Sequence, residues 1–390
     1  MTEYRKAQPG EWEDCIELAN YVFSTSHRPH DFEKILPKVY QAGEQMTSIH
    51  RVAVDEKGKL RAMVAVLPQE LAVCGHMLRA GYVGTVCVHP KARGEGHMKH
   101  LLGDWLKELE GACDLLVLDG QRQRYGYFGF TPGSIRFVFE ICRPNLRHAF
   151  GSSAGEGITF EPLFSSGNRE GGISLAVKLN ESKPFHVIRS SETVEDVMKT
   201  FGEEALAVKK NGELIGYFLM AGPTGLVESA LLNESDRAAA VAAYMRWRDL
   251  QELQITVPVY ERETIGTLSS FAEEWNLGRC GSAMLRIMDF ANVLEAYLTL
   301  KAQTIGISQG FFSAVMDGQP VSVYSDGVQV TVKREAAPDA PVLSREQAQE
   351  LLLSYTAAAG DHAGIAKETW SRIPSDWFPL PVFWYMADEF

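Results

Sequence analysis

The sequence predicts an α+β (mixed α/β) fold divided into three domains, and three observations support this prediction. The chain has 390 residues, 45% of them hydrophobic and 23% charged, which is enough for two or three soluble cores. Apolar strands and amphipathic helices alternate along most of its length. A glycine-rich loop, Arg93-Gly94-Glu95-Gly96, connects an apolar strand to a helix.

Residues 1–145 are expected to form the first domain. Its predicted elements, in order, are a helix over Glu11–Phe23, strands at Ile49–Val54, Leu60–Leu67, Glu70–Cys74 and Tyr82–Val88, a helix over Gly96–Leu109, and strands at Leu115–Leu118 and Ile135–Ile141. The helices are predicted from apolar residues that recur every three or four positions, and the strands from short apolar runs bounded by turn residues.

Residues 146–280 are expected to form the second domain, which follows a linker rich in Gly, Ser and Ala over Asn145–Glu156. Its predicted elements are a strand at Ile173–Leu179, a helix over Thr193–Phe201, a hairpin over Ala205–Met220 that turns at Asn211-Gly212, a strand at Leu226–Leu232 and a helix over Glu234–Leu250. No Arg-Gly-x-Gly loop follows these strands. A degenerate copy of the first domain and an unrelated α/β domain both fit this pattern.

Residues 281–390 are expected to form the third domain. The segment Leu285–Asp289 leads into a helix that runs through Leu300. The further predicted elements are strands at Gly310–Met316, Gln319–Ser325 and Gly327–Lys333 and a helix over Ser344–Tyr355. This order resembles that of a sterol-carrier-protein-like domain.

The glycine-rich loop predicts a site for a pyrophosphate. A strand ending in Val86-Cys87-Val88, a turn marked by Pro90 and a helix after Gly96 place free backbone N–H groups at the positive end of a helix dipole. Glycines let the backbone approach an anion closely. The loop is neither a Walker A motif nor a dinucleotide-binding G-x-G-x-x-G motif. The alternative is a turn that only connects the strand to the helix.

Composition excludes several other classes. The net charge of −12 argues against a general nucleic-acid binder, and no apolar run is long enough for a membrane span. The N-terminal residues do not form a signal peptide. Six cysteines lack C-x-x-C spacing, so we expect reduced thiols in a cytoplasmic protein. His89, His97 and His100 have no partner spacing for a metal, and we expect no metal, nucleic-acid or membrane partner.

Three features together resemble the enhanced-intracellular-survival (Eis) acetyltransferases of the GNAT superfamily. They are the Val-x-Val strand with its Arg-Gly-x-Gly loop, the segment Leu285–Asp289, and the final residues Glu389-Phe390. The last small position of the superfamily loop is Met98 here. The resemblance implies an active GNAT domain at 1–145, an inactive GNAT-like domain at 146–280 and a sterol-carrier-like domain at 281–390.

The resemblance also implies chemistry and partners. The co-substrate would be acetyl-CoA, and the acceptor a primary amine of an aminoglycoside-like molecule, a polyamine or a lysine. Copies of the chain would assemble as hexamers. The residues implied to bind acetyl-CoA are Val86, Cys87, Val88, Arg93, Gly94, Glu95, Gly96, His97, Met98, Lys99, Tyr125 and Gly126. Without the family, Arg93 and Lys99 would be solvated surface bases of slight effect.

A tyrosine is the expected proton donor to the departing thiolate. The motif Tyr125-Gly126-Tyr127-Phe128-Gly129-Phe130 resembles that of the Eis enzymes, whose first tyrosine has this role, and the role falls on Tyr125. A phenol has a pKa near 10, which suits an acid for a developing thiolate. The family often closes the motif with a second tyrosine, where this chain has Phe130. Tyr127 is the second candidate, and a purely structural aromatic role is the alternative.

The end of the chain is expected to be docked rather than free. Six of the residues from Asp376 to Phe390 are aromatic, and exposing them would forfeit their burial energy. In Eis enzymes the terminal carboxylate, here that of Phe390, is the proton acceptor, and the position of Glu389 contacts a cationic substrate. Because an α-carboxyl group has an ordinary pKa of about 3.5, burial must raise it or water must relay the proton. The alternative is that Phe390 only fills a groove.

The sequence therefore predicts an N-acetyltransferase that transfers an acetyl group by direct attack of the amine on the thioester. The rival is an acyl-CoA- or lipid-binding protein without turnover, in which apolar stretches such as Phe311–Val315 line a lipid cavity. His27, His30 and Asp31 lie where GNAT domains often meet the acceptor, although surface positions explain each of them equally well.

Overall fold

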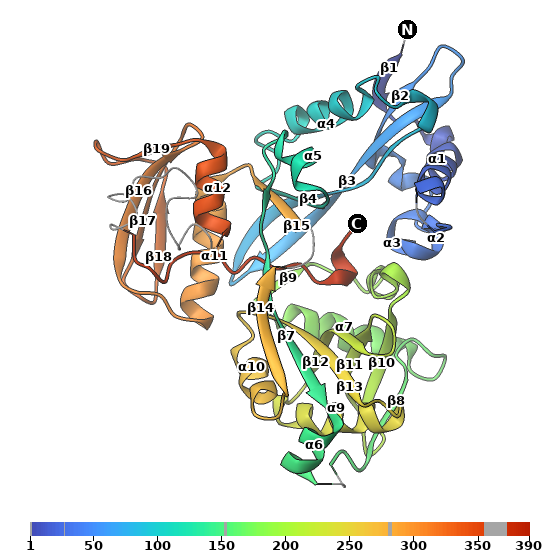
Figure 1. Ribbon diagram of the computed structural model, residues 1–390, viewed down its shortest axis with the longest axis vertical. Coiled ribbons are helices and arrows are strands. Elements are labelled where there is room, and N and C mark those ends of the chain that lie inside the picture. The colour runs from blue at the N-terminus through green and yellow to red at the C-terminus, as the bar shows by residue number, and fades with distance from the viewer. Residues whose placement is uncertain (1, 27, 152–153, 280–282, 355–372) are drawn as a thin grey trace.

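The computed structural model describes residues 2–26, 28–151, 154–279, 283–354 and 373–390. Figure 1 shows an N-terminal lobe above a central lobe, with a C-terminal lobe beside them. The final segment of the chain leaves the C-terminal lobe and ends between the other two lobes (Figure 1). The chain end thus lies far in sequence, but not in space, from the N-terminal sheet.

The N-terminal lobe is built on the first sheet, whose strand order is β1-β2-β3-β4-β5-β15-β6, with β9 paired to β3. Its strands are β1 (Glu3–Lys6), β2 (His50–Val54), β3 (Leu60–Val73), β4 (His76–Val88), β5 (Leu115–Asp119), β6 (Thr131–Pro132), β9 (Phe185–Val187) and β15 (Ala283–Ile287). Its helices are α1 (Trp12–Ser26), α2 (Phe32–Ile35), α3 (Pro37–Tyr40), α4 (His97–Glu108) and α5 (Arg122–Gly126).

The central lobe is built on the second sheet, of order β8-β10-β11-β12-β13-β7-β14. Its strands are β7 (Ile135–Cys142), β8 (Ile158–Pro162), β10 (Glu204–Lys210), β11 (Glu213–Met220), β12 (Gly225–Leu231), β13 (Glu252–Pro258) and β14 (Glu274–Arg279). Its helices are α6 (Arg143–Phe150), α7 (Arg169–Glu181), α8 (Val194–Val197), α9 (Arg237–Trp247) and α10 (Arg262–Ser269).

The two sheets have matching topologies and exchange one strand each. In both, four antiparallel strands are followed by a parallel pair, β4 with β5 and β12 with β13. The next strand in each sheet comes from the other half of the chain, because β15 lies between β5 and β6 and β7 lies between β13 and β14. This exchange crosses both expected domain boundaries, at 145/146 and 280/281. The matching order supports the copy interpretation of the central lobe, and the three-domain division stays a prediction.

The C-terminal lobe shares its core with the N-terminal lobe. Its sheet has the order β18-β17-β16-β19, and its elements are α11 (Phe290–Thr304), β16 (Gly310–Met316), β17 (Gln319–Ser325), β18 (Val330–Lys333), β19 (Val342–Leu343) and α12 (Arg345–Leu353). Helix α11 packs on β17 and β18 and also on β3 and β4. One apolar cluster therefore runs from α1 through α11 to the chain end at Phe390.

Most predicted elements of the N-terminal lobe are confirmed, but the separate strand predicted at Glu70–Cys74 is wrong, because these residues continue β3, which runs unbroken over Leu60–Val73. Two predictions in the central part are also wrong. The hairpin that turns at Asn211-Gly212 forms as expected, with positive φ at both turn residues. The predicted strand at Ile173–Leu179 lies instead in helix α7, because the buried residues Gly172, Ala176 and Leu179 recur at helical spacing. The expected linker at Asn145–Glu156 begins inside helix α6.

Candidate active site

Strands β4 and β5 separate and leave backbone groups of β4 available. They pair in parallel only where Ala80–Tyr82 faces Leu115–Val117, although β4 continues to Val88. A bulge on β4 places Thr85 and Val86 opposite a single residue of β3, and Thr85 has a positive φ of 44°. The Tyr40 hydroxyl donates to Thr85 Oγ1 at 2.8 Å and holds this bulge in place. An extended molecule with amide groups can therefore pair with β4 along the open edge.

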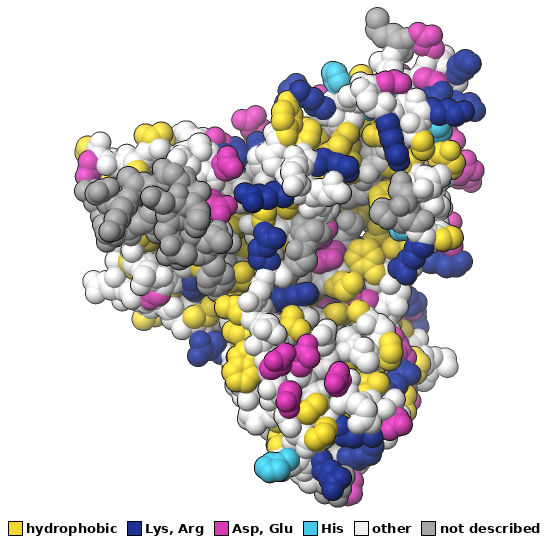
Figure 2. All heavy atoms as spheres, viewed as in Figure 1, with side chains coloured by type: hydrophobic (Ala, Val, Ile, Leu, Met, Phe, Trp, Pro, Cys, Tyr) yellow, Lys and Arg dark blue, Asp and Glu magenta, His cyan; other side chains and the backbone are white. Residues whose placement is uncertain are grey.

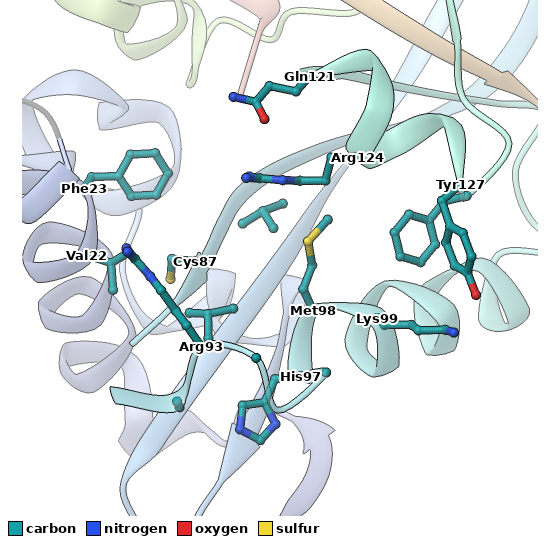
Figure 3. Close-up of a pocket in the computed structure, with 16 residues that line it drawn as sticks. Val22, Phe23, Cys87, Arg93, His97, Met98, Lys99, Gln121, Arg124 and Tyr127 are labelled. Carbon is teal, nitrogen blue, oxygen red and sulfur yellow. The ribbon is translucent and has the colours of Figure 1, made fainter. Parts of the chain in front are cut away.

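A cavity of about 870 Å³ adjoins this part of β4 (Figure 3). Apolar side chains from α1, β4 and the segment after α5 form much of its wall, and basic side chains flank it. Figure 3 shows Arg93 and Arg124 reaching toward the cavity from different elements, with Met98 pointing up between them. On the face seen in Figure 2, Lys and Arg side chains gather over and around α4 and α5. The site suits a ligand with an apolar arm and an anionic part.

The glycine-rich loop forms the floor of this cavity. Gly94 and Gly96 have φ angles of 88° and 82°, in the left-handed region that favours glycine. A Cβ atom at either position would meet nothing within 4 Å, so the backbone conformation rather than space requires glycine here. Gly96 caps α4, whose first-turn N–H groups then face the loop. The loop thus presents N–H groups and the positive helix end to an anion, as a pyrophosphate requires.

Nine of the sequence-predicted residues line the cavity together: Val86, Cys87, Val88, Arg93, Gly94, Gly96, His97, Met98 and Lys99. Glu95, Tyr125 and Gly126 do not line it. The cavity is also lined by six residues that were not predicted from the sequence: Val22, Phe23, Ala92, Gln121, Arg124 and Phe128. Arg124 could have been predicted, because this basic residue directly precedes the motif that begins at Tyr125. Val22 and Phe23 could not, since they look like any apolar positions of an amphipathic helix.

The two candidate tyrosines lie in different environments. Tyr125 on α5 is 6% exposed and contacts the ring of Phe130 edge-on. Burial raises the pKa of the Tyr125 phenol above its ordinary value, and Arg124 beside it opposes this. Tyr127 is 67% exposed, lines the cavity and lies under Lys99, whose Nζ is 4.7 Å from the ring centroid. Tyr125 therefore keeps its proton at neutral pH in a buried position, whereas Tyr127 is an exposed ring at the surface.

The thiol in the cavity wall is a poor nucleophile. Cys87 is buried, and burial raises the pKa of its thiol well above the ordinary value. A thiol attacks as its thiolate, which this environment disfavours. Cys87 is therefore better suited to packing than to forming a covalent acyl intermediate.

The end of the chain is anchored against β4 at the start of the bulge. A Cβ atom on Gly84 would lie 2.6 Å from Phe390 O and 2.7 Å from Phe390 Cδ1, so the close approach requires glycine. Lys38 Nζ donates to the carbonyl oxygen of Ala387 at 2.6 Å and also to that of Glu389. Gln69 Nε2 donates to the Asp388 carbonyl oxygen at 2.6 Å. Three consecutive carbonyls are thus held, and the final residue is directed to Gly84.

Acidic side chains surround this anchored end. The Tyr82 hydroxyl donates to Asp119 Oδ2 at 2.5 Å at the end of β5. Burial, and then Asp119 nearby, raise the pKa of Glu389 to about 8, while Lys38 and Arg136 oppose the shift. Burial lowers the pKa of Lys38 to about 8. The region therefore favours an additional positive charge, such as that of an amine substrate.

The loop residues expected near an acceptor have structural roles where they are described. Asp31 caps α2 by accepting from the Lys34 N–H at 3.4 Å. His30 Nδ1 lies 2.6 Å from the Arg28 carbonyl oxygen, and its ring stacks on Phe32. His27 lies outside the described residues. Within the described ranges, no group of three or more His, Cys, Asp or Glu side chains could hold a metal, and no helix is long and apolar enough to cross a membrane.

Glu203, the residue directly before β10, predicts a pH-dependent stability. Both of its carboxylate oxygens are buried without a hydrogen-bond partner among the described residues. Burial, and then Glu228, raise its pKa to about 9. The native state therefore keeps a proton that the unfolded chain releases above its ordinary pKa of about 4.5. The contribution of Glu203 to the free energy of unfolding is therefore fully present below a pH of about 4.5, and it is lost as the pH rises toward 9.

We expect Glu203→Gln to melt at nearly the wild-type temperature at pH 5 and at a higher temperature than wild type at pH 8, as followed by calorimetry. The neighbouring Glu204→Gln is the control, because Glu204 is exposed and pairs with Arg248 on the surface. A melting-temperature difference for Glu203→Gln that does not change between pH 5 and 8 contradicts the protonated native state.

Comparison with known proteins agrees with this geometry. Residues 3–132 match the family model described as an acetyltransferase (GNAT) domain. No curated protein sequence matches the chain. Among solved structures, a GCN5-related N-acetyltransferase from Anabaena variabilis ATCC 29413 has 15% identity, covers 99% of this chain and 98% of its own, and gives a TM-score of 0.66. One from Kribbella flavida has 12% identity, coverages of 100% and 98%, and a TM-score of 0.65.

Eis1 from Mycobacterium abscessus has 12% identity, covers all of both chains and gives a TM-score of 0.64. At these identities the likeness is one of fold, and it extends over all three lobes. It agrees with the resemblance inferred from the loop and the chain end. Residues 3–132, which hold the loop and most of the residues that line the cavity, thus match a GNAT acetyltransferase domain, and the whole chain shares its fold with these solved structures.

Proposed function

We propose that the protein transfers the acetyl group of acetyl-CoA to a primary amine by direct attack on the thioester. The observation that carries the proposal is a juxtaposition: an anion-binding loop, the open edge of β4 and the anchored end of the chain follow one another along a single strand. The loop suits the pyrophosphate of acetyl-CoA, and the open edge of β4 suits its pantetheine arm. The anchored chain end supplies the carboxylate that would accept the proton of the amine.

The residues of the loop and cavity would hold acetyl-CoA. The N–H groups from Gly94 to Lys99 face the pyrophosphate, and Arg93 and Arg124 add positive charge. The unpaired edge of Val86–Val88 offers N–H and C=O groups to the amides of the pantetheine arm. Glu95, His97 and Met98 contribute mainly through their backbone. His97 is held in place by the Tyr4 hydroxyl, 2.9 Å from its Nδ1.

The acceptor amine would enter beside the chain end. Asp119 attracts its cationic form, and Glu389 ionises beside the added positive charge. The ammonium first gives one proton to solvent, and the carboxylate of Phe390 takes the second proton as the neutral nitrogen attacks the carbonyl carbon. The C–N bond forms and the C–S bond breaks. The departing thiolate takes the phenolic proton of Tyr125, and Gly126 directly after it ends α5. An aminoglycoside-like molecule, a polyamine and a lysine side chain all supply such an amine.

Further features of the proposal come from the family resemblance. We propose that residues 281–390 are a sterol-carrier-like domain, that residues 146–280 are a GNAT-like domain without acetyl-CoA, and that the protein works as a cytoplasmic hexamer. The central lobe supports the second of these points. After β12 it has the acidic turn Glu234–Asp236 in place of a basic glycine loop, and this turn would repel a phosphate.

The function is tested with purified protein, acetyl-CoA and a panel of polyamines, lysine peptides and aminoglycosides. We expect release of free CoA thiol, measured with a thiol reagent, at turnover numbers on the order of 1–10³ per second for at least one amine. A chain extended by one residue beyond Phe390 should still bind acetyl-CoA but lose turnover, because its Phe390 carboxylate becomes an amide. Silence across the panel, with lipid bound to the purified protein, would favour the lipid-binding rival.

Gly84→Ala tests the contact between β4 and the chain end. The added methyl group would overlap the backbone of Phe390, so we expect kcat to fall by about tenfold or more while acetyl-CoA binding, measured by calorimetry, persists. Gly103→Ala on α4 is the matched control, since a Cβ atom there meets nothing within 4 Å. Equal kcat values for the two variants would place the chain end outside the mechanism.

The tyrosine pair tests the proton donor. Tyr125→Phe should lower kcat by about a hundredfold or more and leave the KM for acetyl-CoA within about twofold, since it removes only a proton. Tyr127→Phe should leave kcat nearly unchanged, because this exposed ring packs against Lys99 and Phe128 and its hydroxyl has no assigned role in the transfer. The opposite ranking of the two variants would transfer the donor role to Tyr127.

A further inference from the structure

We propose that Arg189 is a positioning residue for acetyl transfer, which holds the segment Ala387–Phe390 so that its end meets Gly84. The proposal rests on the proposed function for what the chain end does there. Arg189 lies just after β9, outside the GNAT acetyltransferase domain and outside the cavity. Its role would be to act through Asp388 on the final residue.

The guanidinium of Arg189 is shared between two carboxylates. Its Nε and Nη2 donate to Asp388 Oδ1 and Oδ2 at 2.9 and 2.8 Å. Its Nη1 and Nη2 donate to Glu228 Oε1 and Oε2 at 3.0 and 2.9 Å. Both pairs are bidentate, which fixes the direction of each carboxylate as well as its distance.

All three charges are removed from water. The side chains of Arg189, Glu228 and Asp388 are 1%, 0% and 2% exposed. Lys183 Nζ and the Tyr217 hydroxyl also donate to Glu228, at 2.6 and 2.7 Å, so this carboxylate is fully engaged from the central lobe. Among the side chains that the structure describes, only that of Arg189 donates to the Asp388 carboxylate. Without the guanidinium, the buried Asp388 carboxylate would lie beside Glu228 with no positive charge to balance it. The Asp388 side chain would then move toward water.

The position of Arg189 connects three parts of the molecule. Strand β9 pairs with Leu71–Val73 of β3 in the first sheet, and Glu228 lies on β12 in the second sheet. Asp388 belongs to the terminal segment, whose neighbouring carbonyls are held by Lys38 and Gln69. Lys38 and Gln69 hold the backbone of the terminal segment, and Arg189 holds the side chain of Asp388. Movement of Asp388 would therefore shift Phe390, two residues further on, away from Gly84.

The test compares Arg189→Lys and Asp388→Asn with Arg237→Lys. Arg237 is a matched control, because it is a buried arginine of the central lobe that bonds Glu234 and Ser229, and among the described residues it has no hydrogen bond or ion pair with residues 387–390. We expect Arg189→Lys to lower kcat by about ten- to a hundredfold and to leave the KM for acetyl-CoA within about twofold. Arg237→Lys should leave kcat within about twofold.

A second measurement does not depend on turnover. Carboxypeptidase A removes a C-terminal phenylalanine when it is accessible, and mass spectrometry follows the loss of Phe390. Below the melting temperature, Arg189→Lys and Asp388→Asn should lose Phe390 at least about tenfold faster than wild type and Arg237→Lys, because the docked end opens more often. The double variant should be no faster than the faster single variant, since both break one interaction.

The outcomes separate this proposal from the proposed function. Unchanged release of Phe390 in both Arg189→Lys and Asp388→Asn overturns the positioning role, whatever the activity. A fall in kcat no larger than that of Arg237→Lys overturns it as well. If the two variants lose Phe390 faster but the wild-type protein acetylates no amine, then Arg189 does hold the chain end and the proposed acetyl transfer is wrong. Should Arg189→Lys fail to fold, Asp388→Asn, which keeps the side-chain volume, gives the same decision.

Discussion

The structure depends on burying a charged segment where two sheets meet. A carboxylate such as that of Asp388 can leave water only if cations and N–H groups replace its hydration, and here Arg189 supplies both. Lys38 and Gln69 do the same for the backbone carbonyls beside it. The central lobe supplies Glu228, the second carboxylate that Arg189 binds. Under the proposed function, the central lobe would support one wall of a site whose chemistry belongs to the N-terminal lobe.

The two halves of the site use different physics. Under the proposed function, the loop at Gly94 and Gly96 would recognise an anion through its backbone geometry, so that side chains such as Met98 could vary without loss of the N–H groups that face the anion. The region of Glu389 and Asp119 instead depends on side-chain charge in a poorly hydrated setting, where each group alters the protonation of the next. Changes to the first half should affect affinity for the donor, and changes to the second should affect the choice of amine and the pH dependence.

The sequence could predict those structures that are determined by residues close together in the chain. The strand–loop–helix at Val86–Gly96 and the hairpin at Asn211-Gly212 depend on neighbours in the chain, and both form as predicted. The exchange of β7 and β15 depends on pairing between distant segments that apolar patterns do not distinguish. The segment of helix α7 was predicted as a strand because a short apolar run fits both the helical and the strand periodicity. Arg189 gave no signal at all, since its two acidic partners lie 39 and 199 positions away.

The strand exchange has a consequence for biosynthesis. The first sheet needs β15 between β5 and β6, but roughly ten to thirty seconds of translation separate the emergence of β5 from that of β15 at typical elongation rates. During that interval the edge of β5 is unpaired and the sheet is open to incorrect partners. The contact order of the protein is correspondingly high, and neither lobe can serve as an independent folding nucleus for its full sheet. Heterologous production should therefore benefit from slow synthesis and abundant chaperones, and dissection into separate lobes would remove a strand from each.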